Sequence, residues 1–147
     1  MAATRRADAT WSGDLATGKG TVSAISSGTF SALATTWASR VESADGRTSP
    51  EELLAAAHAS CFSMAFANDL SKKGFVPDRL AVTANVTLDQ TDAGRRVISS
   101  ALTVTGRVPG IDAATFAEIA EASKNGCPIS NAIKGNVALS VEATLES

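Results

Sequence analysis

The sequence predicts an α+β domain, because two kinds of hydrophobic periodicity follow one another along its 147 residues. Several segments alternate apolar and polar residues with the period of a β-strand, whereas two others carry the end signals of helices. The expected order is three strands, a long helix, a two-stranded hairpin, one or two short helices and a final strand. This order favours an antiparallel sheet with packed helices, in a single domain over residues 1–147.

The first third of the chain is expected to form strands. Short runs rich in Thr, Val, Ile and Phe are separated by turn signals at residues 13–14, 17–20 and 26–28, which predicts strands near 10–12, 21–25 and 29–34. The polar segment 35–47 is expected to be irregular, with a turn at Asp45–Gly46.

A long helix follows, and both of its ends are marked. Ser49 is expected to be the N-cap, Pro50 the first helical residue and Glu52 the partner in a capping box. The helix should reach about Lys73 and stop at Gly74. Residues 53–67 are apolar on nearly all faces, which predicts a helix buried on all sides by sheet, by a partner subunit or by both.

The remaining elements come from the second half of the chain. Alternation over 80–88 and 98–108 predicts a hairpin with its turn at 89–94. Asp112 should cap a helix over 113–124, with Gly126 as the residue just beyond its C-cap, and Pro128 should begin a short helix reaching about 134. Strict alternation over 137–145 predicts the last strand.

Composition narrows the range of partners and compartments. The net charge is −2 and the thirteen basic residues are scattered, so nucleic acid is an unexpected partner. No apolar segment follows the N-terminal arginines, so no signal peptide is expected. The longest apolar stretch is shorter than the ~20 residues that span a bilayer. We therefore expect a cytoplasmic protein without a membrane partner, whose cysteines form a transient rather than a permanent disulfide.

Two cysteines are the main candidates for chemistry. Cys61 and Cys127 are 66 residues apart, which excludes a CxxC redox motif, and two lone thiols cannot complete a four-ligand zinc site. What remains is a pair brought together by folding, in which one thiol attacks and the other resolves. The simpler alternative is that Cys61 is a small core residue, because most buried cysteines are. We expect no metal, because there are too few candidate ligands. We expect no nucleotide cofactor, since no P-loop or Rossmann signature is present.

A reactive Cys61 needs a nearby cation, because only the thiolate attacks and burial favours the neutral thiol. Arg40, in the segment before the helix, is the best candidate. Glu51 is ten residues before Cys61, or ~15 Å along an ideal helix, so it cannot contact Cys61 of its own helix. Glu51 would instead orient Arg40 or serve a site built partly by another subunit; its simpler role is a favourable charge at a helix N-terminus.

Two further positions allow a functional and a structural interpretation. Cys127 precedes Pro128 at an expected helix start, where its sulfur should be accessible, or it is a turn residue with an idle thiol. His58 lies three residues before Cys61 on the same helix face. A Cys–His pair is conceivable, but a packed histidine hydrogen-bonded in the core is the favoured interpretation.

These motifs match a known family along the whole chain. Residues 48–65, with the sequence TSPEELLAAAHASCFSMA, together with the sequence GCPIS at 126–130, resemble the OsmC/Ohr family of thiol peroxidases. Similar agreement extends to residues 11–23, 86–94 and 108–116. The sequence around His58 is similar to that of the OsmC branch, since the Ohr branch tends to carry Tyr at that position.

The resemblance implies an OsmC-like α+β fold with antiparallel sheets, a long buried central helix and an intertwined homodimer with two active sites at the interface. It implies that Cys61 is the peroxidatic cysteine and Cys127 the resolving one. It also implies that Arg40 and Glu51 activate the thiolate and position the hydroperoxide, with Arg47 as the alternative arginine.

The expected activity is reduction of organic hydroperoxides to alcohols through a Cys61 sulfenic acid and a Cys61–Cys127 disulfide. A dithiol reductant, which in the family is often a lipoyl group on a protein, would reopen that disulfide. Two alternatives stay open: a non-enzymatic protein that binds a small hydrophobic ligand, and a stress protein whose cysteines only sense redox state.

Overall fold

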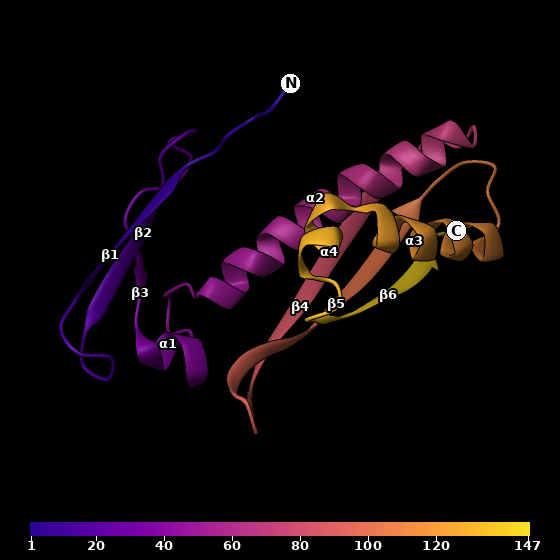
Figure 1. The fold of residues 1–147 in the computed structure, drawn as a ribbon. Coiled ribbons are helices and arrows are strands. Elements are labelled where there is room, and N and C mark those ends of the chain that lie inside the picture. Colours follow the sequence, from indigo (N-terminus) through magenta and orange to yellow (C-terminus); the bar gives the residue numbers. More distant parts are fainter. The chain divides into compact units, whose positions relative to one another are not determined.

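The computed structural model describes residues 1–147, which form two compact units, Met1–Leu53 and Leu54–Ser147. Each unit contains a three-stranded sheet (Figure 1). The elements, in chain order, are β1 (Ala7–Ser12), β2 (Lys19–Ala24), β3 (Leu33–Thr35), α1 (Trp37–Val41), α2 (Pro50–Lys72), β4 (Arg79–Thr91), β5 (Gly94–Arg107), α3 (Ala113–Gly126), α4 (Pro128–Ile133) and β6 (Ala138–Leu145). The predicted α+β class is confirmed by this content.

The first unit is built on an antiparallel sheet in the order β1-β2-β3. Gly20 pairs with Trp11 in this sheet, and a Cβ at Gly20 would lie 2.7 Å from the Trp11 ring, so only glycine permits this close approach. The expected turn at 17–20 is therefore partly wrong, because β2 already begins at Lys19. The third strand is shorter than predicted, since Ala32 adopts a positive φ of 53° and interrupts it.

A short helix, α1, lies in the segment that was predicted to be irregular. Thr36 is its N-cap, and Ser39 completes a capping box in which each side chain accepts from the other residue's backbone N–H. The sequence does carry this capping box, as a Thr and a Ser three residues apart, but the N3 position of a capping box is usually Glu or Gln rather than Ser.

Helix α2 begins and ends close to the predicted residues. The Ser49 hydroxyl accepts from the backbone N–H of Glu52 at 3.1 Å, which confirms half of the predicted capping box. The other half is different, because the Glu52 carboxylate accepts from the Thr48 hydroxyl at 2.6 Å. Gly74, with a φ of 88°, follows the end of the helix as expected.

Only one face of α2 is buried in the second unit. His58, Phe62, Phe66 and Leu70 recur every four residues and are fully buried. On the other side Met64 is 65% exposed, and Ala56, Ala57 and Ser60 are exposed as well. The single chain buries one face of α2 only, so burial of the outer face, for which the prediction allowed a partner subunit, stays a prediction.

The second unit contains a mixed sheet in the order β4-β5-β6. Strands β4 and β5 form the predicted hairpin, with a tighter turn at Asp92–Ala93 than expected. Strand β6 pairs with β5 in parallel, so the prediction of a purely antiparallel sheet is wrong (Figure 1). The physical reason is the connection: α3 and α4 lie between β5 and β6 and bring the chain back to the starting end of β5.

The core of the second unit lies between one face of this sheet and helices α2 and α3. Leu102 and Val104 of β5 pack with Phe66 and Phe116, whose ring centroids are 5.0 Å apart. A Cβ at Gly106 would lie 2.5 Å from the Phe116 ring, so glycine makes room for this aromatic side chain.

Helix α3 has the predicted N-terminus and a later end. The Asp112 side chain accepts from the Thr115 backbone N–H at 2.8 Å, as an N-cap should. The helix was predicted to cover 113–124 with Gly126 just beyond its end, but α3 continues through Gly126, which has no positive φ, and Cys127 is the C-cap. Helix α4 begins at Pro128 as predicted. None of the helices combines the length and hydrophobicity that a membrane span requires.

Candidate active site

Cys61 lies on α2 at the side of an open groove in the second unit. The side chain is partly exposed, whereas most of the apolar residues one turn away on the core face are buried. The groove has a volume of about 450 Å³ and is lined by Cys61, Met64, Ala65, Asn68, Asp69, Lys72, Gly126 and Pro128. Cys61 is therefore accessible to a small molecule that enters the groove.

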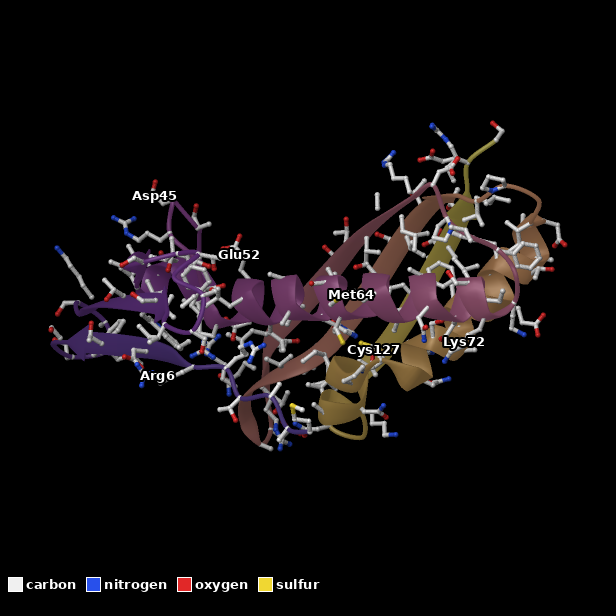
Figure 2. The ribbon with its side chains drawn as sticks, turned by 90° about the horizontal axis from the view of Figure 1, so that it is seen from above. Arg6, Asp45, Glu52, Met64, Lys72 and Cys127 are labelled. Atoms are coloured by element: carbon white, nitrogen blue, oxygen red, sulfur yellow. The ribbon has the colours of Figure 1, made fainter.

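Cys127 is the residue that joins α3 to α4. It is the C-cap of α3 and the N-cap of α4, and Figure 2 shows it alongside α2. Both cysteines are free thiols, and Cys127 is fully buried. The expectation that the Cys127 sulfur is accessible is therefore wrong, because its side chain faces the core beside α2 rather than solvent.

The two thiols interact with each other. Burial raises the pKa of the Cys61 thiol, and the adjacent Cys127 thiol raises it further, whereas the backbone N–H of Ile129 opposes them by donating to the Cys61 sulfur. No cationic side chain of the second unit lowers this pKa. Lys72 also lines the groove, but its backbone lies about 16 Å from that of Cys61 along α2. That distance is too long for the Lys72 side chain to reach the Cys61 sulfur. Cys61 thus needs a further cation to become a thiolate near neutral pH.

Arg40 and Glu51 form an ion pair in the first unit. The Arg40 Nε donates to both Glu51 carboxylate oxygens at 3.0 and 3.1 Å, and a terminal nitrogen donates at 2.8 Å. The Glu51 side chain is only 10% exposed and that of Arg40 is 35% exposed. Arg47, the alternative arginine, instead pairs with Asp45 at 3.0 Å. Arg40 rather than Arg47 is therefore the partner of Glu51.

Arg40 also borders an apolar pocket of about 460 Å³ within the first unit. Its guanidinium carbon lies 6.0 Å from the centre of the Trp37 ring, in the range of a cation–π contact. The pocket is lined by Ala9, Thr10, Trp11, Leu15, Thr21, Val22, Thr35, Thr36, Trp37, Arg40, Pro50 and Leu53. A guanidinium beside an apolar wall suits a ligand with one polar and one hydrocarbon end.

His58 is fully buried and hydrogen-bonded through both ring nitrogens, which agrees with the favoured interpretation. Its Nδ1 lies 2.6 Å from the Ser100 hydroxyl and its Nε2 lies 2.8 Å from the Ser130 hydroxyl. Sequence reasoning did not find these serines, since they are distant in the chain and have no local signal. Burial lowers the pKa of His58, so the ring is neutral near pH 7.

The structure thus brings together two separate sets of predicted residues. Cys61 and Cys127 meet in the second unit, and Arg40 meets Glu51 in the first. No group of three or more His, Cys, Asp or Glu side chains is arranged to hold a metal ion. The thiol pair is suited to redox chemistry, and the ion pair can orient a guanidinium toward an anion or a peroxide.

Comparison with known proteins identifies the class to which this fold and these thiols belong. Residues 43–142 match the family of OsmC-like proteins, and the chain belongs to that family. The family predicted from the two cysteine motifs is therefore confirmed.

Among individual relatives, peroxiredoxin OsmC of Escherichia coli K12 is 44% identical over 135 residues, which are 92% of this chain and 93% of that protein. The organic hydroperoxide resistance protein of Xanthomonas axonopodis is 31% identical over 91 residues, covering 61% of this chain and 62% of that protein. The crystal structure of the organic hydroperoxide resistance protein OhrB of Bacillus subtilis superposes with a TM-score of 0.71 at 23% identity, covering 95% of this chain and 98% of that chain. The predicted OsmC/Ohr fold is confirmed.

Proposed function

We propose that this protein is a thiol-dependent peroxidase that reduces organic hydroperoxides to alcohols. The observation that carries the proposal is the arrangement of the two thiols: Cys61 borders an open groove, and the buried Cys127 is in contact with it. The names of the relatives, a peroxiredoxin and an organic hydroperoxide resistance protein, support the same activity.

The chemistry proceeds in three steps. The Cys61 thiolate attacks the distal oxygen of the hydroperoxide, the O–O bond breaks, and the alkoxide takes a proton and leaves as the alcohol. The Cys127 sulfur then attacks the Cys61 sulfenic acid, a disulfide forms and water leaves. A dithiol reductant, for which a lipoyl group on a protein is our candidate, transfers two electrons by thiol–disulfide exchange and restores both thiols.

Arg40 and Glu51 are proposed to activate Cys61 in a homodimer. A cation is required because burial raises the pKa of Cys61 and no cation of the second unit offsets this. Glu51 and Cys61 lie in the same continuous helix, α2, ~15 Å apart along its axis. At that distance Glu51 cannot hold Arg40 against the Cys61 sulfur of its own chain. We therefore assign the activating Arg40–Glu51 pair to the other subunit, where the apolar pocket beside Arg40 would receive the organic part of the substrate.

The proposal is tested by titrating the reduced protein with one equivalent of cumene hydroperoxide per subunit and measuring intact mass. The wild-type protein should lose both thiols and two hydrogen masses, as formation of an intrachain disulfide requires. Cys61→Ser should consume no hydroperoxide. Cys127→Ser, the matched control, should consume one equivalent and stop with a sulfenic acid that dimedone traps. If Cys61→Ser consumes hydroperoxide at the rate of the wild-type protein, the mechanism is refuted.

A second candidate function is supported by the pocket of the first unit. Its volume of about 460 Å³ and its two tryptophans, Trp11 and Trp37, would suit a small hydrophobic ligand without any thiol chemistry. Survival of both wild-type thiols after hydroperoxide treatment would favour this function. Oxidation that occurs once, with no dithiol restoring the thiols, would favour the redox-sensing alternative.

A further inference from the structure

The hydrogen bonds of His58 join three elements of the second unit. His58 projects from α2, Ser100 lies on β5 and Ser130 lies on α4, and all three side chains are at most 1% exposed. A neutral imidazole has one donor and one acceptor, and a serine hydroxyl can serve either role, so both contacts are satisfied without a charge. Burial, which lowers the pKa of His58, agrees with the neutral form.

The bond to Ser130 lies one helical turn from both thiols. His58 is three residues before Cys61 on α2, and Ser130 is three residues after Cys127, the N-cap of α4. Residues three apart share a helix face. The His58–Ser130 bond therefore links α2 to α4 beside the point where the Cys61 and Cys127 thiols interact.

Helix α4 is short, and few of its side chains are buried. It has six residues, and Ser130 is the only one of them that is buried. Ile129 packs partly against the core, and Pro128 and Asn131 are exposed. A short helix gains little stability from its own backbone hydrogen bonds, so its position depends on tertiary contacts. The buried bond from Ser130 to His58 is the side-chain hydrogen bond that joins α4 to α2, next to the contact between the Ile129 backbone N–H and the Cys61 sulfur.

We propose that His58 is a positioning residue that, through Ser130, holds Cys127 against Cys61 for disulfide formation. This inference rests on the proposed function. In the step concerned, the Cys127 sulfur attacks the Cys61 sulfenic acid, an S–S bond forms, the S–O bond breaks, and the hydroxyl leaves as water with the Cys127 proton. His58 neither gives nor takes a proton in this step; it keeps the attacking sulfur within reach.

The test compares Ser130→Ala with Ser100→Ala under single-turnover conditions. Each variant removes one hydrogen bond from the same ring, so both should lower the unfolding midpoint to a similar extent. Only Ser130→Ala removes the side-chain bond between α4 and α2. We expect it to slow disulfide formation about tenfold, because loss of alignment acts on the rate of the intramolecular step. Ser100→Ala should slow that step less than about twofold, since it loosens the ring from β5 only.

A second readout separates positioning from a general loss of stability. With excess hydroperoxide, a sulfenic acid that waits longer for Cys127 is oxidised further, so Ser130→Ala should accumulate the sulfinic form, which carries two added oxygens. Consumption of the first equivalent of hydroperoxide should keep its wild-type rate. If Ser130→Ala does not fold, His58→Leu removes the same bond and is expected to show the same two changes.

Equal effects of the two serine variants on disulfide formation, or no effect of either, would overturn the positioning role. The wild-type protein distinguishes this failure from failure of the proposed function. If the wild-type thiols survive one equivalent of hydroperoxide, the peroxidase mechanism itself is wrong and there is no condensation step for His58 to support.

Discussion

The two units of the molecule differ most in how they bury apolar side chains. Every buried hydrophobic side chain belongs to the second unit, between Phe62 and Val137. In the first unit only Gly18, Gly20 and Glu51 are buried, and all six residues of β1 are exposed. A three-stranded sheet without a covered face is not expected to be stable alone. The first unit therefore has no buried core of its own, whereas the second does.

The same contrast applies to the chemistry. The second unit holds an accessible thiol with a resolving thiol behind it but no activating cation. The first unit holds an oriented guanidinium beside an apolar pocket but no nucleophile. The second unit thus lacks the cation and the first unit lacks the thiol, which is why we propose above that the Arg40–Glu51 pair acts on Cys61 of another subunit.

The largest expected effect concerns the core. Phe116→Ala should lower the free energy of unfolding by about 3–5 kcal/mol, because it removes a fully buried ring and leaves a cavity beside Gly106. Trp11→Ala, in the first unit, should cost much less at protein concentrations where single chains predominate, since Trp11 is 44% exposed there. Urea unfolding of both variants measures the difference. Equal losses would show that the first unit has a core of its own.

The next effect concerns the ion pair. Arg40→Gln should lower kcat/KM about a hundredfold, because the guanidinium that stabilises the thiolate and the developing charge is lost. Steady-state peroxidase assays with a dithiol reductant measure this loss. Arg47→Gln is the matched control, since Arg47 pairs only with Asp45 at the surface, and its activity should stay near that of the wild type.

Mixed dimers sharpen this result. Arg40→Gln and Cys61→Ser chains, refolded together, should recover about a quarter of wild-type activity, because half of the randomly paired dimers contain one intact site. If each site were built from one chain, the mixture would recover nothing. That outcome would refute the assignment of Arg40 and Glu51 to the other subunit.

A smaller effect is expected from mass action. If the first unit and the exposed face of α2 around Met64 are covered by a second copy, each tenfold rise in protein concentration should add about 1.4 kcal/mol to the apparent stability of the dimer. Thermal unfolding at several concentrations tests this. A midpoint that does not depend on concentration, together with a monomeric mass in solution, would contradict the homodimer.

The smallest effect is a pH dependence centred on His58. Its pKa is lowered by burial from the ordinary value of 6.5, so the unfolded chain binds a proton at a higher pH than the folded chain. The free energy of unfolding should therefore fall as the pH drops below about 6.5, and this decline should end near the lower folded-state pKa.

His58 is the single histidine of the chain, so no other side chain with an ordinary pKa titrates in that range. Urea unfolding between neutral and mildly acidic pH should show a flatter profile for His58→Leu than for the wild type. Parallel profiles would mean that the histidine is protonated equally in both states.

Local signals were sufficient for most elements. The Ser49–Pro50 start of α2, the Asp112 cap of α3, Pro128 at the start of α4 and the alternation of β6 predicted those elements to within a few residues. The short α1 was missed because its capping box uses Ser39. The direction of β6 was also missed, since alternation defines a strand but not the strand beside it or its orientation.

The sequence by itself determined the family, the α+β content and the identity of the two thiols, because caps, periodicity and the motifs around Cys61 and Cys127 are local patterns. Only the tertiary structure decided that Cys127 is buried and Cys61 accessible, that Arg40 rather than Arg47 pairs with Glu51, and that His58 is bound by Ser100 and Ser130. These features depend on contacts between residues up to 72 positions apart. Such contacts are fixed by packing of whole elements, which no local pattern specifies.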